Sequence, residues 1–411
     1  MSFFFFKHLF IFKKIWKDFF NLIMKKINLF LLSMGTIISI PLTIISCSKK
    51  NFNFAVNQLW SGKTDFNFFN LVSKEFNKQR NTSYKPNIKL ISENNNIIDL
   101  IKKGSSNIAF ITTILYMSEY LKNKNTNILP IIQTQTRAFN FDKNFNDRYS
   151  DGLENDKLRL IAKKAQDLFE KKPYLDWTDD EYKWNGQIYE YFYANNDELV
   201  DFYRGIIMIH GNKQQLAKIK KAWNNKDWNT FRNFGFLTGK KTSGSKYIAQ
   251  QSLFKKHFNL ENNKFTSFEE DKINHSEKYI EGKARDIGKG QFKNFHIVFD
   301  ELGSFAYTKN KNENKEKKYY TLENSEEKIE FLTVTEAIKY NVLAVNKNAF
   351  NSEEIETLKE IIIKLWKDKK DDYGQNVGIN GYKKIGNFEN EVVEPFLKFF
   401  KINNENKKWD S

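Results

Sequence analysis

The sequence predicts an α/β fold in which parallel sheets are covered by helices, and three observations carry that prediction. Short apolar runs typical of strands alternate with longer segments whose apolar residues recur every three or four positions. Strand and helix units of this size favour parallel sheets with helices on both faces. The chain has 411 residues, 40% of them hydrophobic, which is enough for two lobes with cores of their own.

The same patterns locate the elements along the chain. Strands are predicted at 52–56, 88–91, 107–111, 128–141, 203–209, 234–237, 295–299, 331–334 and 341–345. Helices are predicted at 66–76, 97–103, 158–169, 216–223, 248–258 and 353–368, the last capped by Asn351 and Ser352. Residues 142–200 are rich in Asp, Asn, Tyr and Trp and break the alternation. They are interpreted as an insertion.

The N-terminal region predicts a secreted, lipid-anchored protein. An uncharged apolar run at 27–46 follows the basic Lys25 and Lys26, and it ends at Cys47, the single cysteine of the chain. This pattern resembles a bacterial lipobox, in which the thiol takes a diacylglyceryl group and the chain is cut before it. We expect a signal peptide at 1–46 (with Met24 as the true start), palmitate-type acylation of Cys47 and a tether at 47–50. The protein would then sit on the outer face of the cell membrane, since two acyl chains anchor stably.

Composition excludes several classes of protein. One cysteine rules out a disulfide framework, and the five histidines show no metal-ligand spacing. Catalytic motifs such as HExxH, a Walker loop or a nucleophile elbow are missing from the sequence, so we expect a protein that is not an enzyme and has no catalytic cofactor. The net charge of +16 suits acidic partners in general, but it matches the lysine-rich usage of AT-rich coding. We do not expect nucleic-acid binding.

A candidate anion site follows the strand at 234–237. Thr242, Ser243, Gly244 and Ser245 open a helix, where hydroxyl groups, unpaired backbone N–H groups and the positive helix end can meet one anion. Lys246 adds positive charge. The alternative reading is an ordinary serine helix cap, which such tetrapeptides usually form.

A second candidate group consists of residues at strand ends and in loops. Aromatic rings suit stacking on a heteroaromatic or cationic ring. With 16% aromatic residues, most of them must be core or surface filler. The ring candidates are Trp60, Tyr116, Tyr307 and Tyr340, and the further ligand candidates are Thr113, Tyr203, Arg204, Glu301 and Ser304. The acidic run 176–181 could hold Ca²⁺, but it lacks EF-hand spacing, and a solvated loop is favoured.

Several stretches closely resemble the mycoplasma high-affinity transport-system lipoproteins, also described as extracytoplasmic thiamine-binding lipoproteins. The longest is KIKKAWNNKDWNTFRNFG at 218–235. The others are PYLDWTD at 173–179, KWNG at 183–186, FYRG at 202–205, GSFA at 303–306, YG at 373–374 and NGYKKI at 380–385. The resemblance covers about 170–400 well and 50–140 weakly.

The resemblance implies a two-lobed type II periplasmic-binding-protein fold, each lobe a mainly parallel sheet flanked by helices, with the ligand in the cleft between lobes. It also implies thiamine pyrophosphate or thiamine as ligand and the membrane subunits of an ABC importer as partners. Lobe one would comprise 51–136 plus 331–411 and lobe two 204–330, with 137–203 an insertion beside the hinge. Strands near 132–137 and 331–335 would cross between the lobes. A monomer is expected.

Phosphonate-binding relatives place a serine- and threonine-rich loop at a helix start against their anion, and TSGSKY at 242–247 is similar to it with a shifted glycine. This strengthens the anion reading of the loop. Two other interpretations stay open, a binding protein for another phosphorylated solute (a phosphonate or a nucleotide) and a surface adhesin. A secreted phosphatase is disfavoured by the missing metal ligands.

Overall fold

The computed structural model describes residues 50–58, 64–92, 94–124, 126–259, 264–310 and 318–400. The predicted signal peptide, the lipidation site Cys47 and the ring candidate Trp60 lie outside these ranges. Within them, every helix is too short or too polar to cross a membrane.

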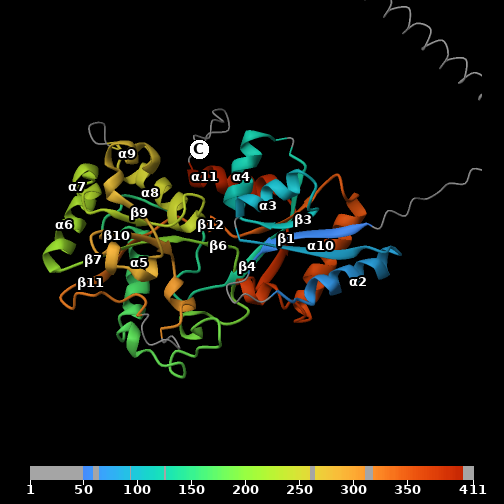
Figure 1. The fold of residues 1–411 in the computed structure, drawn as a ribbon, viewed down its shortest axis with the longest axis horizontal. Helices are drawn as coiled ribbons and strands as arrows, with labels where there is room; N and C mark the ends of the chain where they lie inside the picture. Colours follow the sequence, from blue (N-terminus) through green and yellow to red (C-terminus); the bar gives the residue numbers. More distant parts are fainter. Residues whose placement is uncertain are drawn as a thin grey trace, which may run out of the picture. The chain divides into compact units, whose positions relative to one another are not determined.

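One sheet has seven strands in the order β14-β4-β13-β3-β1-β2, with β5 paired to β4 (Figure 1). β1 runs parallel to β2 and β3, whereas β13 runs antiparallel to β3 and β4. The strands are β1 (Asn51–Asn57), β2 (Lys85–Ile91), β3 (Ile108–Ile111), β4 (Ile128–Arg137), β5 (Leu199–Val200), β13 (Val342–Asn346) and β14 (Gly381–Lys384).

Helices cover both faces of this sheet. Side chains alternate between the two faces along each strand, so apolar side chains on each face can pack against helices. Phe52 and Phe54 of β1 face a core with α2 and α10, whereas Ala55, the residue after Phe54, joins the core under α3, α4 and α11. These helices are α2 (Phe68–Arg80), α3 (Asn94–Lys102), α4 (Thr113–Lys122), α10 (Ser352–Lys367) and α11 (Glu394–Phe400). The predicted cap of α10 is confirmed, since Asn351 accepts a hydrogen bond of 2.9 Å from the N–H of Glu354.

A second sheet has five strands in the order β11-β7-β10-β8-β9. Its strands are β7 (Gly205–Gly211), β8 (Phe236–Thr238), β9 (Tyr279–Glu281), β10 (Ile297–Glu301) and β11 (Lys328–Val334). The helices α6 (Lys213–Asn224), α7 (Trp228–Arg232), α8 (Ala249–His257) and α9 (Phe268–His275) lie with it on one side of Figure 1. Phe254 of α8 lies among Trp223, Phe236 and Phe299, so aromatic rings dominate this core.

The α/β class is confirmed, but the expectation of mainly parallel sheets is wrong. In the seven-stranded sheet β13 and β14, which the chain forms after it returns from the other sheet, run antiparallel to their partners β3 and β4. In the other sheet β7 runs antiparallel to both β10 and β11, while β8 is parallel to β10 and β9. Strand direction depends on how the chain re-enters a sheet after visiting the other one. Periodicity within a strand carries no such information.

The segment interpreted as an insertion contains α5 (Lys157–Phe169) and short 3-10 turns. Its buried rings, including Tyr174, Trp177 and Phe192, belong to the same hydrophobic core as β7 and β10. The backbone N–H of Tyr189 donates to the carbonyl of Ala306 at 2.7 Å. The segment is therefore packed as part of the body built on the five-stranded sheet.

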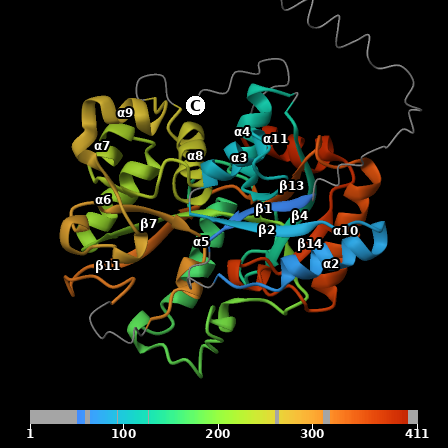
Figure 2. The same cartoon turned by 45° about the vertical axis from the view of Figure 1, so that its right-hand side comes forward.

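The chain leaves the seven-stranded sheet at 138–141, returns to it at β5, leaves it again at 201–204 and comes back at 335–341. Two of these passages pair with each other, because β6 (Phe202–Tyr203) and β12 (Ile338–Lys339) form a two-stranded antiparallel ribbon. In Figure 1 the labels β6 and β12 lie between those of the two sheets, and Figure 2 shows the strands β7 and β11 of one sheet and β1, β2 and β4 of the other on opposite sides in a second view. Lys339 of this ribbon forms an ion pair of 2.7 Å with Asp201. The ribbon brings both sheets to the candidate site.

Candidate functional site

The loop after β8 lies where the sequence predicted an anion site, at the start of a helix. Residues Gly244–Ile248 form one π-helical turn that continues into α8. Ser243 caps this turn by accepting a hydrogen bond of 3.2 Å from the N–H of Lys246. The N–H groups of Gly244 and Ser245, as first-turn groups, have no acceptor inside the helix. The buried amide of Gln250 donates to the carbonyl of Ser245 at 2.6 Å and so fixes the loop to the sheet.

Two carboxylates at the end of β10 lie against this loop. The Ser245 hydroxyl donates to Glu301 at 2.8 Å, and Lys246 forms an ion pair of 3.2 Å with Asp300. Asp300 is buried and also accepts from Tyr320 at 2.8 Å. Burial raises the pKa of Glu301, while the nearby Lys246 and the Ser245 hydroxyl oppose the shift. The loop therefore presents donors and negative charge side by side.

Four tyrosines surround Glu301, and they come from four different segments. Tyr193, Tyr203, Tyr307 and Tyr340 are each half-buried. Burial raises the pKa of each phenol, and the charge of Glu301 adds to the shift in all four. The rings of Tyr203 and Tyr340 meet edge to face at 5.6 Å. The result is a partly desolvated carboxylate with aromatic walls.

The start of α4, which packs on the seven-stranded sheet, also lies at this site. The Thr113 hydroxyl donates to the backbone carbonyl of Tyr340. A β-carbon at Gly244 would lie 2.4 Å from the hydroxyl oxygen of Tyr203 and 3.6 Å from a methyl of Ile114. Glycine therefore lets the loop approach the Tyr203 hydroxyl this closely, whereas the distance to α4 is an ordinary van der Waals contact.

Three predicted site residues lie away from this group. Tyr116 is buried, and its ring packs on Tyr120 and Phe388 in the core of the seven-stranded sheet. Arg204 is buried in an ion pair of 2.9 Å with Asp142. Ser304 is buried and donates to Asp300, behind the loop.

The structure brings together Thr113, Tyr203, Gly244, Ser245, Lys246, Glu301, Tyr307 and Tyr340, and half-buried Thr242 and Ser243 adjoin them in the loop. Sequence reasoning missed Tyr193 and Asp300. Asp300 could have been recognised from the sequence, because it precedes Glu301 at the end of a predicted strand. Nothing in the sequence distinguishes Tyr193, since it is one of 18 tyrosines and lies in the irregular segment.

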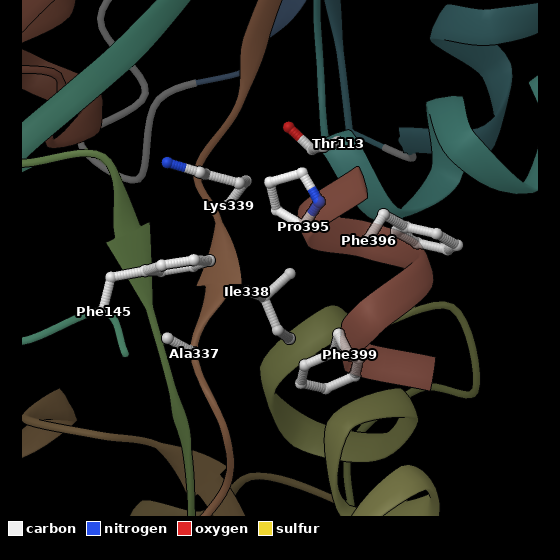
Figure 3. A pocket seen from close by; sticks show the side chains of 8 residues that line it. All are labelled: Thr113, Phe145, Ala337, Ile338, Lys339, Pro395, Phe396 and Phe399. Carbon is white, nitrogen blue, oxygen red and sulfur yellow. The ribbon is translucent and has the colours of Figure 1, made fainter. Parts of the chain in front are cut away.

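A separate small pocket lies beside the ribbon, behind Thr113. Its cavity volume is about 10 Å³, far below the roughly 300–1,000 Å³ of typical small-molecule sites. Figure 3 shows that α11 supplies one wall and Phe145 the other, with Ile338 between them. The lining residues are Thr113, Phe145, Ala337, Ile338, Lys339, Pro395, Phe396 and Phe399. It offers few polar groups to a charged solute.

The acidic run considered for Ca²⁺ pairs with lysines instead. Asp179 lies 2.9 Å from Lys309, and Glu181 lies 2.5 Å from Lys172. Across the part of the chain that the structure describes, no group of three His, Cys, Asp or Glu side chains is placed to hold a metal ion.

Several known proteins are similar to this chain over most of its length. The model of the family of extracytoplasmic thiamine-binding lipoproteins (CypI) matches residues 47–400. A high-affinity transport system protein, p37, of Mesomycoplasma hyorhinis is 38% identical over 371 residues, covering 86% of this chain and 89% of its own. The protein of that name in Mycoplasma pneumoniae is 29% identical over 378 residues, covering 88% and 95%.

Among solved structures, that of the Mycoplasma hyorhinis protein Mh-p37 superposes with a TM-score of 0.77 and 36% identity. The match covers 85% of this chain and 98% of that one. These relatives are transport proteins, in line with the expectation from sequence that the chain is not an enzyme.

Proposed function

We propose that the chain, a member of the family of extracytoplasmic thiamine-binding lipoproteins, captures thiamine pyrophosphate outside the cell. It would then deliver this solute to an ABC-type importer. Mh-p37 is itself described as a proposed thiamine pyrophosphate transporter. The observation that carries the proposal here is the joining of a helix-start loop, a carboxylate and four tyrosines where the two sheets meet. A diphosphate ester of a cationic heteroaromatic ring needs these kinds of group.

The two halves of the ligand would use different groups. The diphosphate would accept hydrogen bonds from the N–H groups of Gly244 and Ser245 and from the Ser243 hydroxyl, at the positive end of the helix. Lys246 would add charge, although Asp300 takes part of it at 3.2 Å. The rings would stack on Tyr307 and Tyr340, which the sequence already suggested for this role, and on Tyr203 in place of Tyr116.

We further propose that the two sheets are the cores of two lobes, 51–136 with the C-terminal part and 204–330, and that these close on the solute. Strand β11 lies at the boundary between these ranges, and it pairs with β7 of the second lobe. The segment 137–203 would lie on the hinge side, since its Tyr193 approaches the site. The importer's membrane subunits would then receive the closed form.

Calorimetric titration of the purified protein tests the ligand. Thiamine pyrophosphate is expected to bind more tightly than thiamine, because only the ester reaches the donors of the loop. A ring-free phosphonate and ATP are titrated as well, because the alternative interpretations predict a phosphonate or a nucleotide as the solute. Tighter binding of ATP or of the phosphonate than of thiamine pyrophosphate would reject the proposed solute.

The lipid anchor is tested separately at Cys47, which lies outside the described residues. Cys47→Ser is expected to move the protein from the membrane fraction to the supernatant, because no thiol remains to be acylated. Ser48→Ala, one residue away, should leave the protein on the membrane. Membrane retention of the Cys47→Ser protein would point to an uncleaved apolar segment as the anchor.

A further inference from the structure

Glu301 forms no ion pair among the described residues of the candidate site. Lys246 pairs with Asp300 at 3.2 Å, so one ammonium faces two neighbouring carboxylates. Glu301 accepts hydrogen bonds from Ser245, at 2.8 Å, and from Tyr307. Hydroxyl donors of this kind hold a carboxylate in place and leave its charge intact.

The hydrogen bond from Ser245 to Glu301 also limits what the loop can offer an anion. The Ser245 hydroxyl has a single hydrogen, and that hydrogen goes to Glu301. The Ser243 hydroxyl accepts from Lys246 and keeps its own hydrogen for a ligand. An anion at the Ser245 hydroxyl, unlike one at the backbone N–H groups, would meet the negative charge of Glu301 at close range, which is repulsive. The loop therefore offers an anion the Ser243 hydroxyl and the backbone N–H groups, while the Ser245 hydroxyl is committed to Glu301, which can accept a cation.

The walls around Glu301 suit a flat cation. Tyr203 touches the loop at Gly244, and Tyr340 meets Tyr203 edge to face at 5.6 Å. Tyr193 is backed by Phe139, whose ring centroid lies 4.7 Å from its own. Aromatic faces attract cations, and both this attraction and a charge-assisted hydrogen bond strengthen where water is partly excluded.

We propose that Glu301 determines specificity by binding the cationic, amino-bearing ring end of the solute, opposite in charge to the end that the Ser243 side of the loop binds. The proposal rests on the proposed function and assigns a chemical class to each end of the same site. It makes Ser245 and Tyr307 positioning residues for the Glu301 carboxylate.

The test compares Glu301→Gln with wild type by calorimetry, using thiamine, thiamine pyrophosphate and inorganic pyrophosphate. Glutamine keeps the shape of the Glu301 side chain and one acceptor oxygen, but it removes the negative charge. It should weaken thiamine and thiamine pyrophosphate alike, by about tenfold or more. Inorganic pyrophosphate, which has no ring, should bind equally well or better, because a repelling charge is gone. This opposite response would not follow from a loosened fold.

Glu281→Gln, at an exposed position at the end of β9, is the matched control and should change none of the three affinities. Unchanged thiamine binding in Glu301→Gln, or tighter binding of thiamine pyrophosphate, would overturn the assignment of Glu301 and leave the proposed function standing. A wild-type protein that binds neither thiamine compound would overturn the proposed function and this assignment together.

Discussion

Arg204→Met is expected to lower the free energy of unfolding by about 3–5 kcal/mol, because it leaves a buried carboxylate without its partner. The Arg204 guanidinium donates to Asp142 at 2.9 Å, to the carbonyl of Asn144 at 2.6 Å and to the carbonyl of Thr335 at 3.2 Å. Arg204 and Asp142 are both buried. These groups come from 138–141, 201–204 and 335–341 or from the residues beside them, so the loss should fall on the segments that connect the two sheets.

Urea unfolding with Arg80→Met as control measures this effect. Arg80 forms an ion pair of 2.8 Å with Glu353, which is 76% exposed, so its loss should cost at most about 1 kcal/mol. Equal losses in the two variants would show that burial of the Arg204 pair contributes nothing.

The pH dependence supplies a second readout for the same variant. Burial raises the pKa of Asp142, and Arg204 opposes that rise. Without Arg204 the folded pKa stays further above its unfolded value, so folding favours the protonated acid. The stability deficit should therefore be smallest at low pH and grow as the pH rises above about 4. A deficit independent of pH would mean that lost packing, rather than a buried charge, causes it.

Ser243→Ala is expected to weaken thiamine pyrophosphate by about ten- to a hundredfold and to leave thiamine nearly unchanged. A hydrogen bond to a charged group contributes about 1.5–3 kcal/mol, and only the ester places a charged oxygen at this end of the loop. Calorimetry with both ligands gives the two affinities. Equal losses for both ligands would place the diphosphate elsewhere.

Two further variants separate ligand contact from helix capping, since Ser243 also caps the turn. Ser267→Ala removes a cap of the same kind at α9, where Ser267 accepts from Glu270 at 3.1 Å, and should leave both affinities unchanged. Ser243→Gly costs the cap only a few tenths of a kcal/mol yet removes the hydroxyl, so it should reproduce the ligand selectivity of Ser243→Ala.

Most elements of the fold could be predicted from the sequence, because helix and strand periodicity and capping are local. The helix predicted at 353–368 is α10 (Ser352–Lys367) with its Asn351 cap, and the strand predicted at 52–56 is β1 (Asn51–Asn57). The loop 242–246 was also recognised, since a strand, a run of small polar residues and a helix follow each other directly.

Strand direction and the membership of the site were decided by tertiary structure alone. Tyr116 and Tyr340 look alike in sequence, each near a strand end, yet packing on Tyr120 and Phe388 buries Tyr116 while the ribbon carries Tyr340 to the loop. Tyr193 reaches Glu301 although 108 positions separate them in the sequence. Contacts of this kind depend on how the chain passes back and forth between the two sheets, and the local spacing of residues holds no information about it.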